Sequence, residues 1–139
     1  MRTSARLNQA LAKSSLNYVS VVCEKHFGKF FVELYILLDS NGLGDASCRM
    51  QLLKLYKLAV PNMRGFEKTT DAISKTMIRD LVHTELFFRI WVILEEYVIR
   101  AFAELESNAQ MFATDHTAAV SIEDVRRVFV TVSRAVAKK

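Results

Sequence analysis

Glycine and proline are scarce in this chain, which has four glycines and one proline in 139 residues. These residue types form most of the turns in all-β proteins, so their scarcity favours an all-α fold and leaves little room for linkers. The length is typical of a single domain. Hydrophobic residues make up 51% of the sequence, which is enough to fill a core.

Cysteines and long apolar runs are also few. Cys23 and Cys48 are the only cysteines, which argues against a disulfide scaffold and favours a reducing compartment. The most apolar stretch, residues 87–103, is interrupted by Arg89, Glu95, Glu96 and Arg100. We therefore expect no membrane-spanning helix and no membrane partner.

Acidic residues are absent before Glu24, whereas Arg2, Arg6 and Lys13 lie in that segment. A basic, serine-containing start without acids is also typical of a mitochondrial transit peptide, which makes mitochondrial localisation an alternative. The net charge of +4 is uneven. Residues 1–65 hold nine basic and four acidic residues (net +5), and residues 66–139 hold ten and eleven (net −1). Any affinity for phosphate should therefore lie in the N-terminal half or on small local patches.

Apolar residues recur at steps of three and four, which predicts amphipathic helices over residues 16–38 and 47–60, from about 73 to about 84, over 88–115, and from 121 onward. The segment 62–70 is predicted to be a connector, with Thr70 or Asp71 capping the next helix. The expected buried faces of the first three helices are Leu16, Val19, Cys23, Phe27, Phe30, Phe31, Leu34 and Leu38; Met50, Leu53, Tyr56 and Val60; and Ile73, Met77, Ile78, Leu81 and Val82.

The helix predicted over residues 88–115 has an unusually wide apolar stripe and would be roughly 40 Å long. Its ends would extend past a single small core unless another element or another chain covers them. The stripe consists of Trp91, Leu94, Val98, Phe102, Leu105, Ala109 and Phe112, with a flanking row of Ile90, Ile93, Tyr97, Ala101 and Ala113.

The last helix is predicted to start at Ser121, because Ser121 and Asp124 have the spacing of a capping box. Glu123 and Asp124 also suit the positive end of the helix dipole. Its inward face should consist of Val125, Val128, Phe129, Val132 and Val136, and its outward face of Arg126, Arg127 and Arg134.

This short–long–short helix order, followed by "SIEDV", resembles the histone fold over roughly residues 73–132. It is most similar to the CENP-T-like kinetochore family, whose central helix has an aliphatic–Glu pair (here Leu94–Glu95), a Phe eight residues later (Phe102) and a small or aromatic pair near its end (Phe112–Ala113). The resemblance implies an all-α chain with a histone-fold domain at residues 66–139 and an N-terminal helical extension at residues 1–65. That extension could also be a degenerate second histone-like unit that covers Trp91 from within the chain.

In that fold two long helices cross in a handshake, and the third helix lies across the end of the central one. The resemblance therefore implies a non-enzymatic subunit that heterodimerises with another histone-fold protein in a nuclear kinetochore or chromatin assembly. A transcription complex is one alternative, and an accessory role in an organellar complex is another. The expected partner interface is Trp91, Leu94, Val98, Phe102, Leu105, Ala109, Phe112, Val125 and Phe129.

DNA is a further candidate partner. The loop before the last helix, "DHTAAVS", has no Lys or Arg, unlike the loops of DNA-wrapping histone folds, and this shifts the weight toward protein assembly. The basic residues at the two ends of the chain are the candidate nucleic-acid contacts, although a basic edge is often only a solvated face. They are Arg2, Arg6, Lys13, Arg126, Arg127, Arg134, Lys138 and Lys139.

No residue pattern predicts catalysis, a metal or a cofactor. Cys23 and His26 form half of a zinc motif, but Cys23 belongs to an apolar stripe, where cysteine usually acts as a small hydrophobic residue. The loop after residue 38 lacks the final bidentate Glu of a calcium loop, because Met50 stands there. The three histidines have no Ser or Cys at catalytic spacing, and no small-molecule substrate is expected.

Overall fold

The computed structural model is all-helical over the residues that it describes, which are 2–40, 42–60, 62–81, 83–107 and 121–138. Within these ranges the side chains of residues 2–13, 43 and 106 are not described. The α-helices are α1 (Arg2–Phe27), α2 (Phe30–Asp39), α3 (Ala46–Ala59), α4 (Met63–Asp80), α5 (Thr84–Ser107) and α6 (Ile122–Ala137), and a 3-10 turn, η1 (Gly42–Gly44), precedes α3.

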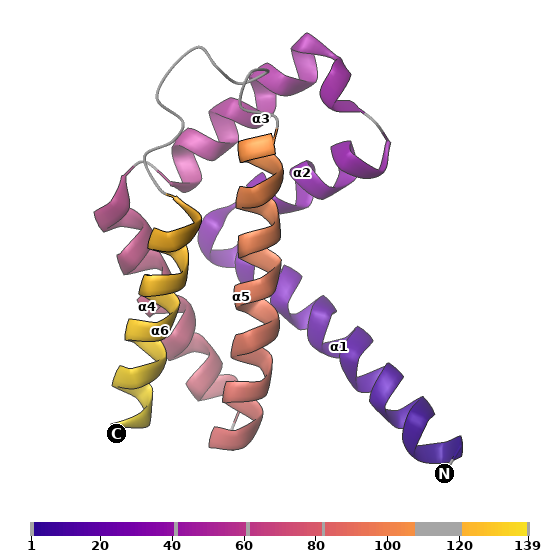
Figure 1. Cartoon of the computed structure of the whole chain (residues 1–139), viewed down its shortest axis with the longest axis vertical. Helices are drawn as coiled ribbons and strands as arrows, with labels where there is room; N and C mark the ends of the chain where they lie inside the picture. The colour runs from indigo at the N-terminus through magenta and orange to yellow at the C-terminus, as the bar shows by residue number, and fades with distance from the viewer. Residues whose placement is uncertain (1, 41, 61, 82, 108–120, 139) are drawn as a thin grey trace.

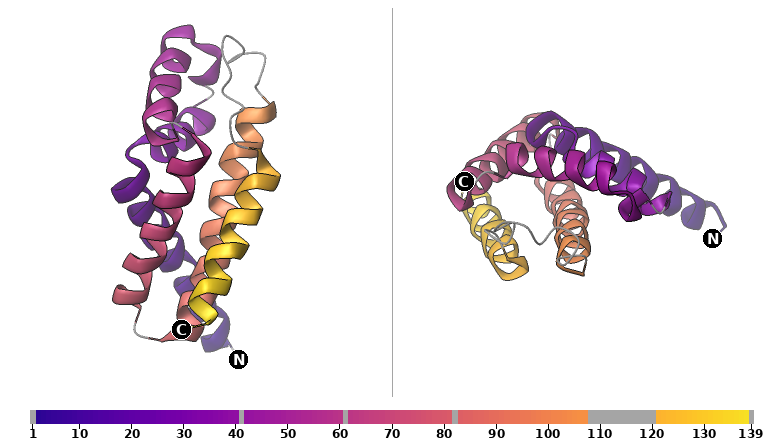
Figure 2. Two further views of the ribbon diagram at one scale, coloured as in Figure 1. Left: turned by 90° about the vertical axis from the view of Figure 1, so that its left-hand side faces the viewer. Right: turned by 90° about the horizontal axis from the view of Figure 1, so that it is seen from above.

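The helices form two layers. Seen from above, α5 and α6 lie side by side beneath a curved layer made by α1 to α4 (Figure 2). The C-terminal half of α1 packs against α4 and α5, and its N-terminal end points away from the bundle (Figure 1). Buried side chains from all six α-helices join in one apolar core.

The single helix predicted over residues 16–38 is wrong, because the chain breaks it at Gly28. Gly28 has a φ of 77°, and its N–H donates to the carbonyl oxygen of Glu24 at 3.0 Å. A glycine in this left-handed conformation ends a helix at low steric cost. The break lets Phe27, Phe30 and Phe31 all point into the core from two helices of different direction.

The predicted connector at 62–70 is also wrong, because α4 begins at Met63. The Asn62 side chain caps the helix by accepting from the N–H of Gly65 at 2.7 Å. Thr70 is buried inside the helix, where its hydroxyl donates to the carbonyl oxygen of Phe66 at 2.8 Å, and Asp71 forms an ion pair with Lys75. The glycine in the first turn of α4 is tolerated because the cap and the buried Phe66 hold that turn.

The helix predicted over 47–60 is confirmed as α3, which Asp45 caps by accepting from the N–H of Ser47 at 2.9 Å. Its expected face is partly wrong, because Met50 is 63% exposed while Leu52 is buried. Ile78, expected to be buried on α4, is likewise exposed. α5 begins four residues earlier than predicted, and the predicted extension past Ser107 lies outside the described residues.

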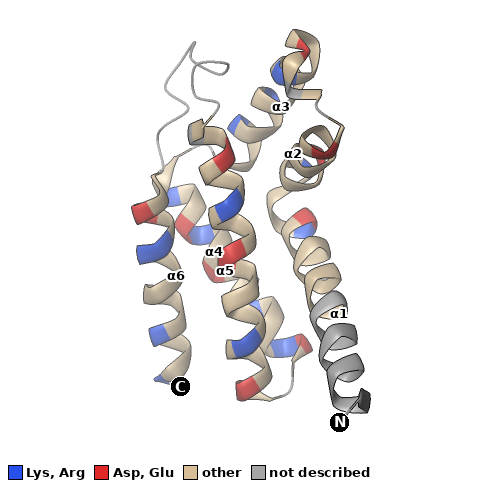
Figure 3. Ribbon diagram, turned by 45° about the vertical axis from the view of Figure 1, so that its right-hand side comes forward, with Lys and Arg blue, Asp and Glu red and all other residues tan. Residues whose placement is uncertain are grey.

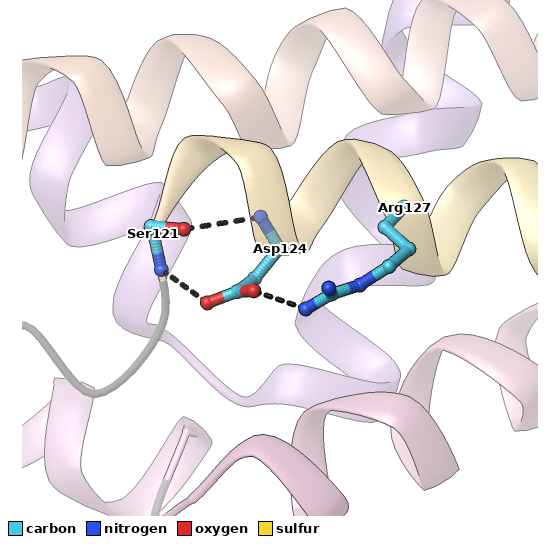
Figure 4. A network of polar contacts seen from close by, with 3 residues as sticks. All are labelled: Ser121, Asp124 and Arg127. Carbon is cyan, nitrogen blue, oxygen red and sulfur yellow. Dashed lines mark hydrogen bonds and ion pairs between the residues drawn. The ribbon is translucent and has the colours of Figure 1, made fainter.

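The start of α6 is confirmed. The Ser121 hydroxyl accepts from the N–H of Asp124 at 3.1 Å, and the Asp124 carboxylate accepts from the N–H of Ser121 at 3.1 Å (Figure 4). These two bonds satisfy backbone donors that the first turn of a helix leaves without a partner. The expected inward residues Val125, Val128, Phe129 and Val132 are buried, and Val136 is half-buried.

α6 lies beside α5 and runs antiparallel to it, rather than across its end as the histone-fold resemblance implies (Figure 2). The Trp91 and Phe129 rings are in contact, with centroids 4.9 Å apart, and the indole N–H of Trp91 donates to the carbonyl oxygen of Phe129 at 3.2 Å. These contacts join the N-terminal half of α5 to the middle of α6.

Candidate interaction groove

The side chains expected to form a partner interface lie mostly in the core of this chain. Trp91 is 3% exposed and Phe102 is 2% exposed, and Leu94, Val98, Val125 and Phe129 are fully buried. Leu105 is half-buried against the same core, whereas Ala109 and Phe112 lie outside the described residues. In this conformation the described anchors are covered from within the chain, so a partner does not reach them.

Phe102 illustrates how the N-terminal helices cover the α5 stripe. Its ring packs edge-to-face against Tyr56 of α3 and Phe66 of α4, with centroid distances of 6.1 and 5.8 Å. Phe31 of α2 contacts Tyr97 with tilted rings, at a centroid distance of 5.7 Å. Aromatic pairs of this geometry add to the stabilisation that apolar burial supplies. The wide stripe on α5 therefore has intrachain partners on several sides.

The basic residues of α6 lie on its outward face, as expected. Arg126, Arg127, Arg134 and Lys138 are exposed, but Arg127 donates to the Asp124 carboxylate (Figure 4). This carboxylate also accepts from the backbone N–H of Ser121, and hydrogen bonding with Ser121 holds the pKa of Asp124 below its usual value. The other candidate contacts, Arg2, Arg6, Lys13 and Lys139, have no described side chains.

The outward face of α5 carries both signs of charge at helical spacing (Figure 3). Burial raises the pKa of Glu95, and the charge of Arg126 on α6 opposes that rise. Figure 3 shows acidic and basic positions interspersed along the described part of α5. The outward residues of α5 are Glu85, Arg89, Glu96, Arg100 and Glu104.

A groove of about 500 Å³ lies between α1, α2 and α5, and sequence reasoning did not predict it. It is called here the α1–α2–α5 groove. Its lining residues are Leu16, Asn17, Ser20, Val32, Tyr35, Ile36, Asp39, Ile93, Glu96, Tyr97 and Arg100.

Two tyrosines stabilise the groove. The Tyr35 hydroxyl donates to the carbonyl oxygen of Tyr97 at 2.7 Å, and the two ring centroids are 4.8 Å apart. The guanidinium carbon of Arg100 lies 5.6 Å from the centroid of the Tyr35 ring, within the range of a cation–π contact. Burial raises the pKa of Tyr35, and it raises the pKa of Tyr97 to about 12. Both hydroxyls therefore remain protonated and act as hydrogen-bonding groups.

Two aliphatic side chains of the groove are exposed to solvent. Leu16 is 50% exposed and Ile36 is 53% exposed. The apolar periodicity predicts that Leu16 belongs to the buried face of a single long helix and that Ile36 lies outside that face. The break at Gly28 redirects α2, which brings Ile36 and Tyr35 beside Leu16 and Ile93. The one sequence feature that indicates the break is Gly28 itself, within "HFGKFF".

The cysteines and histidines do not converge. Cys23 is fully buried, and burial raises the pKa of its thiol; Cys48 lies on α3. His26 contacts the Thr76 hydroxyl, with 3.0 Å between Nε2 and Oγ1. Among the described residues, no group of three or more His, Cys, Asp or Glu side chains is arranged to hold a metal ion. His116 lies outside that part of the chain.

The chemistry that the groove offers is that of recognition: apolar contact, aromatic rings, and charged groups of both signs. Asp39 and Glu96 supply carboxylates and Arg100 supplies a cation. Within the described part of the chain, no helix has the length and apolar character needed to cross a bilayer. Comparisons of the chain with protein-family models, with curated proteins and with solved structures find no match.

Proposed function

We propose that this chain is a non-enzymatic helical subunit that binds another polypeptide in the α1–α2–α5 groove. The observation that carries the proposal is the exposure of Leu16 and Ile36 in a groove that Tyr35 and Tyr97 also line. An apolar groove with a few charged groups at its edge is the usual receptor for an amphipathic helix.

The groove and the core differ in how much apolar area they leave exposed for a partner. Trp91, Leu94, Val98 and Phe102 of the α5 stripe are already buried by the chain's own helices, so these four side chains offer almost no apolar area for a partner to bury. The groove offers such area, because burial of an exposed Leu or Ile side chain contributes roughly 1.5–3 kcal/mol. Tyr35 and Tyr97 are held by their mutual contact, so little side-chain entropy is lost when a partner binds.

The resemblance noted above suggests the class of assembly. We propose a subunit of a nuclear kinetochore or chromatin complex, with α4–α6 as a histone-like unit. The features that support this are the helix order over residues 63–137 and the capping box that opens α6. In this proposal α1 to α3 cover the stripe that a histone partner would cover, and the partner binds the groove instead. A transcription complex or an organellar complex would use the same groove.

The test is recovery of a partner from cells with wild-type chain and with Ile36→Glu. A matched control is Leu58→Glu, because Leu58 is 81% exposed on α3 and is not among the residues that line the groove. We expect Ile36→Glu to lose the co-purifying protein while Leu58→Glu retains it, with unchanged helical content in both. Equal recovery with both variants would contradict the proposal.

A second candidate function is phosphate binding by the C-terminal half of α6. Its supporting observation is that the sequence contains no acid after Asp124, while Arg126, Arg134 and Lys138 are exposed. Binding of a DNA duplex should weaken steeply with salt, in proportion to the number of phosphate contacts. Arg134→Ala combined with Lys138→Ala should make binding of the duplex less dependent on salt concentration. An unchanged salt dependence would exclude this surface as the phosphate-binding site.

A further inference from the structure

We infer that the occupant of the α1–α2–α5 groove is an amphipathic helix of a partner protein, and that basic side chains beside its apolar face bind the carboxylates of Asp39 and Glu96. The inference rests on the proposed function, since it states the chemistry of the polypeptide that the same groove receives. Three features of the described lining lead to it: its backbone, its exposed aliphatic side chains and its charges.

The backbone along the groove has little to offer an extended peptide. The lining residues of α1 and α5 lie inside these helices, at positions 16–20 and 93–100, so their N–H and C=O groups bond within the helix. An extended peptide binds by adding a strand to a sheet edge, and the described residues form no strand. A helix satisfies its own backbone groups, so it is the conformation that fits this groove.

The tyrosine side chains of the lining are also engaged within the chain. Tyr35 donates to the carbonyl oxygen of Tyr97, and Tyr97 shares a side-chain hydrogen bond with Ser20. Between them the groove offers rings and aliphatic surface, of which Leu16 and Ile36 are the most exposed. A helix that covers this surface needs apolar residues three and four positions apart, because these spacings form one face.

The charges of the lining are unbalanced. Asp39 and Glu96 are exposed, and the described ion pairs include neither of them. Arg100 follows Glu96 by one turn of α5, but its guanidinium carbon lies 5.6 Å from the centroid of the Tyr35 ring. The lining therefore has two carboxylates and one cation, and the cation already contacts a ring.

Lysine or arginine side chains at the edge of the partner's apolar face would complement these carboxylates. Because Asp39 and Glu96 are exposed, their attraction mainly speeds association and selects the partner, while apolar burial supplies the affinity. An acidic helix would meet like charge at both positions and would be rejected. Binding should weaken when salt is raised from about 0.1 M to about 1 M, because salt screens exposed charges.

The test is selection of short peptides from a displayed random library on the folded full-length chain. Only peptides whose affinity falls about tenfold or more with Ile36→Glu are counted, since this change removes apolar contact in the groove. Leu58→Glu, outside the lining, should leave their affinity unchanged. We expect the counted peptides to have apolar residues at spacings of three and four, and more Lys and Arg than the unselected library.

Charge variants of the groove test the second half of the inference. Asp39→Lys combined with Glu96→Lys should select acidic amphipathic peptides instead. Asp39→Asn combined with Glu96→Gln should keep the apolar spacing and lose the preference for basic residues. The matched control is Glu67→Lys combined with Glu123→Lys, which changes the net charge as the first pair does, at exposed positions outside the lining. It should select the same peptides as the wild type. Circular dichroism checks that each variant folds.

The outcomes separate this inference from the proposed function. Counted peptides with no excess of basic residues, or with the same composition for the wild type and the Asp39→Lys, Glu96→Lys variant, would overturn the assigned charge chemistry. Counted peptides without helical spacing would overturn the assigned conformation. In both cases the groove remains a polypeptide-binding site. If the library yields no peptide that depends on Ile36, both proposals fail.

Discussion

The hydroxyl of Tyr35 on α2 donates to the carbonyl oxygen of Tyr97 on α5 at 2.7 Å. This bond joins two helices that the break at Gly28 brings together, and both tyrosines line the α1–α2–α5 groove. The bond is part-buried, and we expect it to help fix the position of α2 against α5.

Tyr35→Phe tests this relationship. It removes the hydroxyl and leaves the carbonyl oxygen of Tyr97 without that donor, so the free energy of unfolding should fall by about 1 kcal/mol. Tyr18→Phe is the matched control, because the Tyr18 hydroxyl donates to an Asp80 carboxylate in an exposed position. Urea denaturation measures both. An effect of Tyr35→Phe no larger than that of Tyr18→Phe would argue against a structural role for the bond.

The covering of α5 by the chain's own helices predicts the effect of a core truncation. Phe102→Ala should lower the free energy of unfolding by about 3–5 kcal/mol, because it leaves a cavity between Tyr56 and Phe66. Val92→Ala, on the exposed side of the same helix, should change it by less than about 0.5 kcal/mol. Similar small effects for both would mean that Phe102 is not part of an intrachain core.

His26 predicts how stability depends on pH. Burial, together with the charges of Lys25 and Arg79, lowers the pKa of His26 below its ordinary value of 6.5. Protonation therefore favours the unfolded chain, and this contribution to stability is fully present above pH 6.5 and is lost as the pH falls through the window below it. His26→Gln, which keeps a hydrogen-bonding group for Thr76, should flatten the dependence between about pH 7 and pH 5. If the free energy of unfolding of His26→Gln depends on pH as steeply as that of the wild type, a group other than His26 causes the dependence.

The capping box of α6 predicts a loss on removal of one hydroxyl. Ser121→Ala leaves the N–H of Asp124 without its acceptor and should lower the free energy of unfolding by about 1 kcal/mol. Ser133→Ala, inside the same helix, is the control; its hydroxyl donates only to the carbonyl oxygen of Val130 one turn earlier. Ser121→Ala should therefore lower the thermal unfolding temperature more than Ser133→Ala does. A larger decrease with Ser133→Ala would contradict the assigned cap.

Helix periodicity and caps made part of this structure predictable. The all-α character, the start of α6 at Ser121 and the inward face Val125, Val128, Phe129 and Val132 follow from local spacing, because a single helix decides them. The start of α4 was missed because Gly65 and Thr70 are poor helix formers, and burial of Phe66 outweighs that preference.

The groove could not be predicted from local patterns, because it depends on the angle between two helices. Leu16 and Ile36 are 20 residues apart in the sequence, so an unbroken helix would place them on opposite faces. The conformation of Gly28 changes the direction of α2 and so decides which of these residues are covered. The same applies to Trp91 and Phe102, whose spacing is equally suited to an interface and to an intrachain core. Packing of α1, α4 and α6 against α5 decides between the two.

The most direct measurement is site-specific photo-crosslinking in living cells. A photoreactive residue at position 36 would lie in the α1–α2–α5 groove, and one at position 58 would lie on an exposed helix face outside the groove lining. We predict a covalent product of higher mass from position 36, with a second copy of this chain or with another protein, and none from position 58. No product from position 36, or equal products from both positions, would contradict the claim that this groove binds a polypeptide.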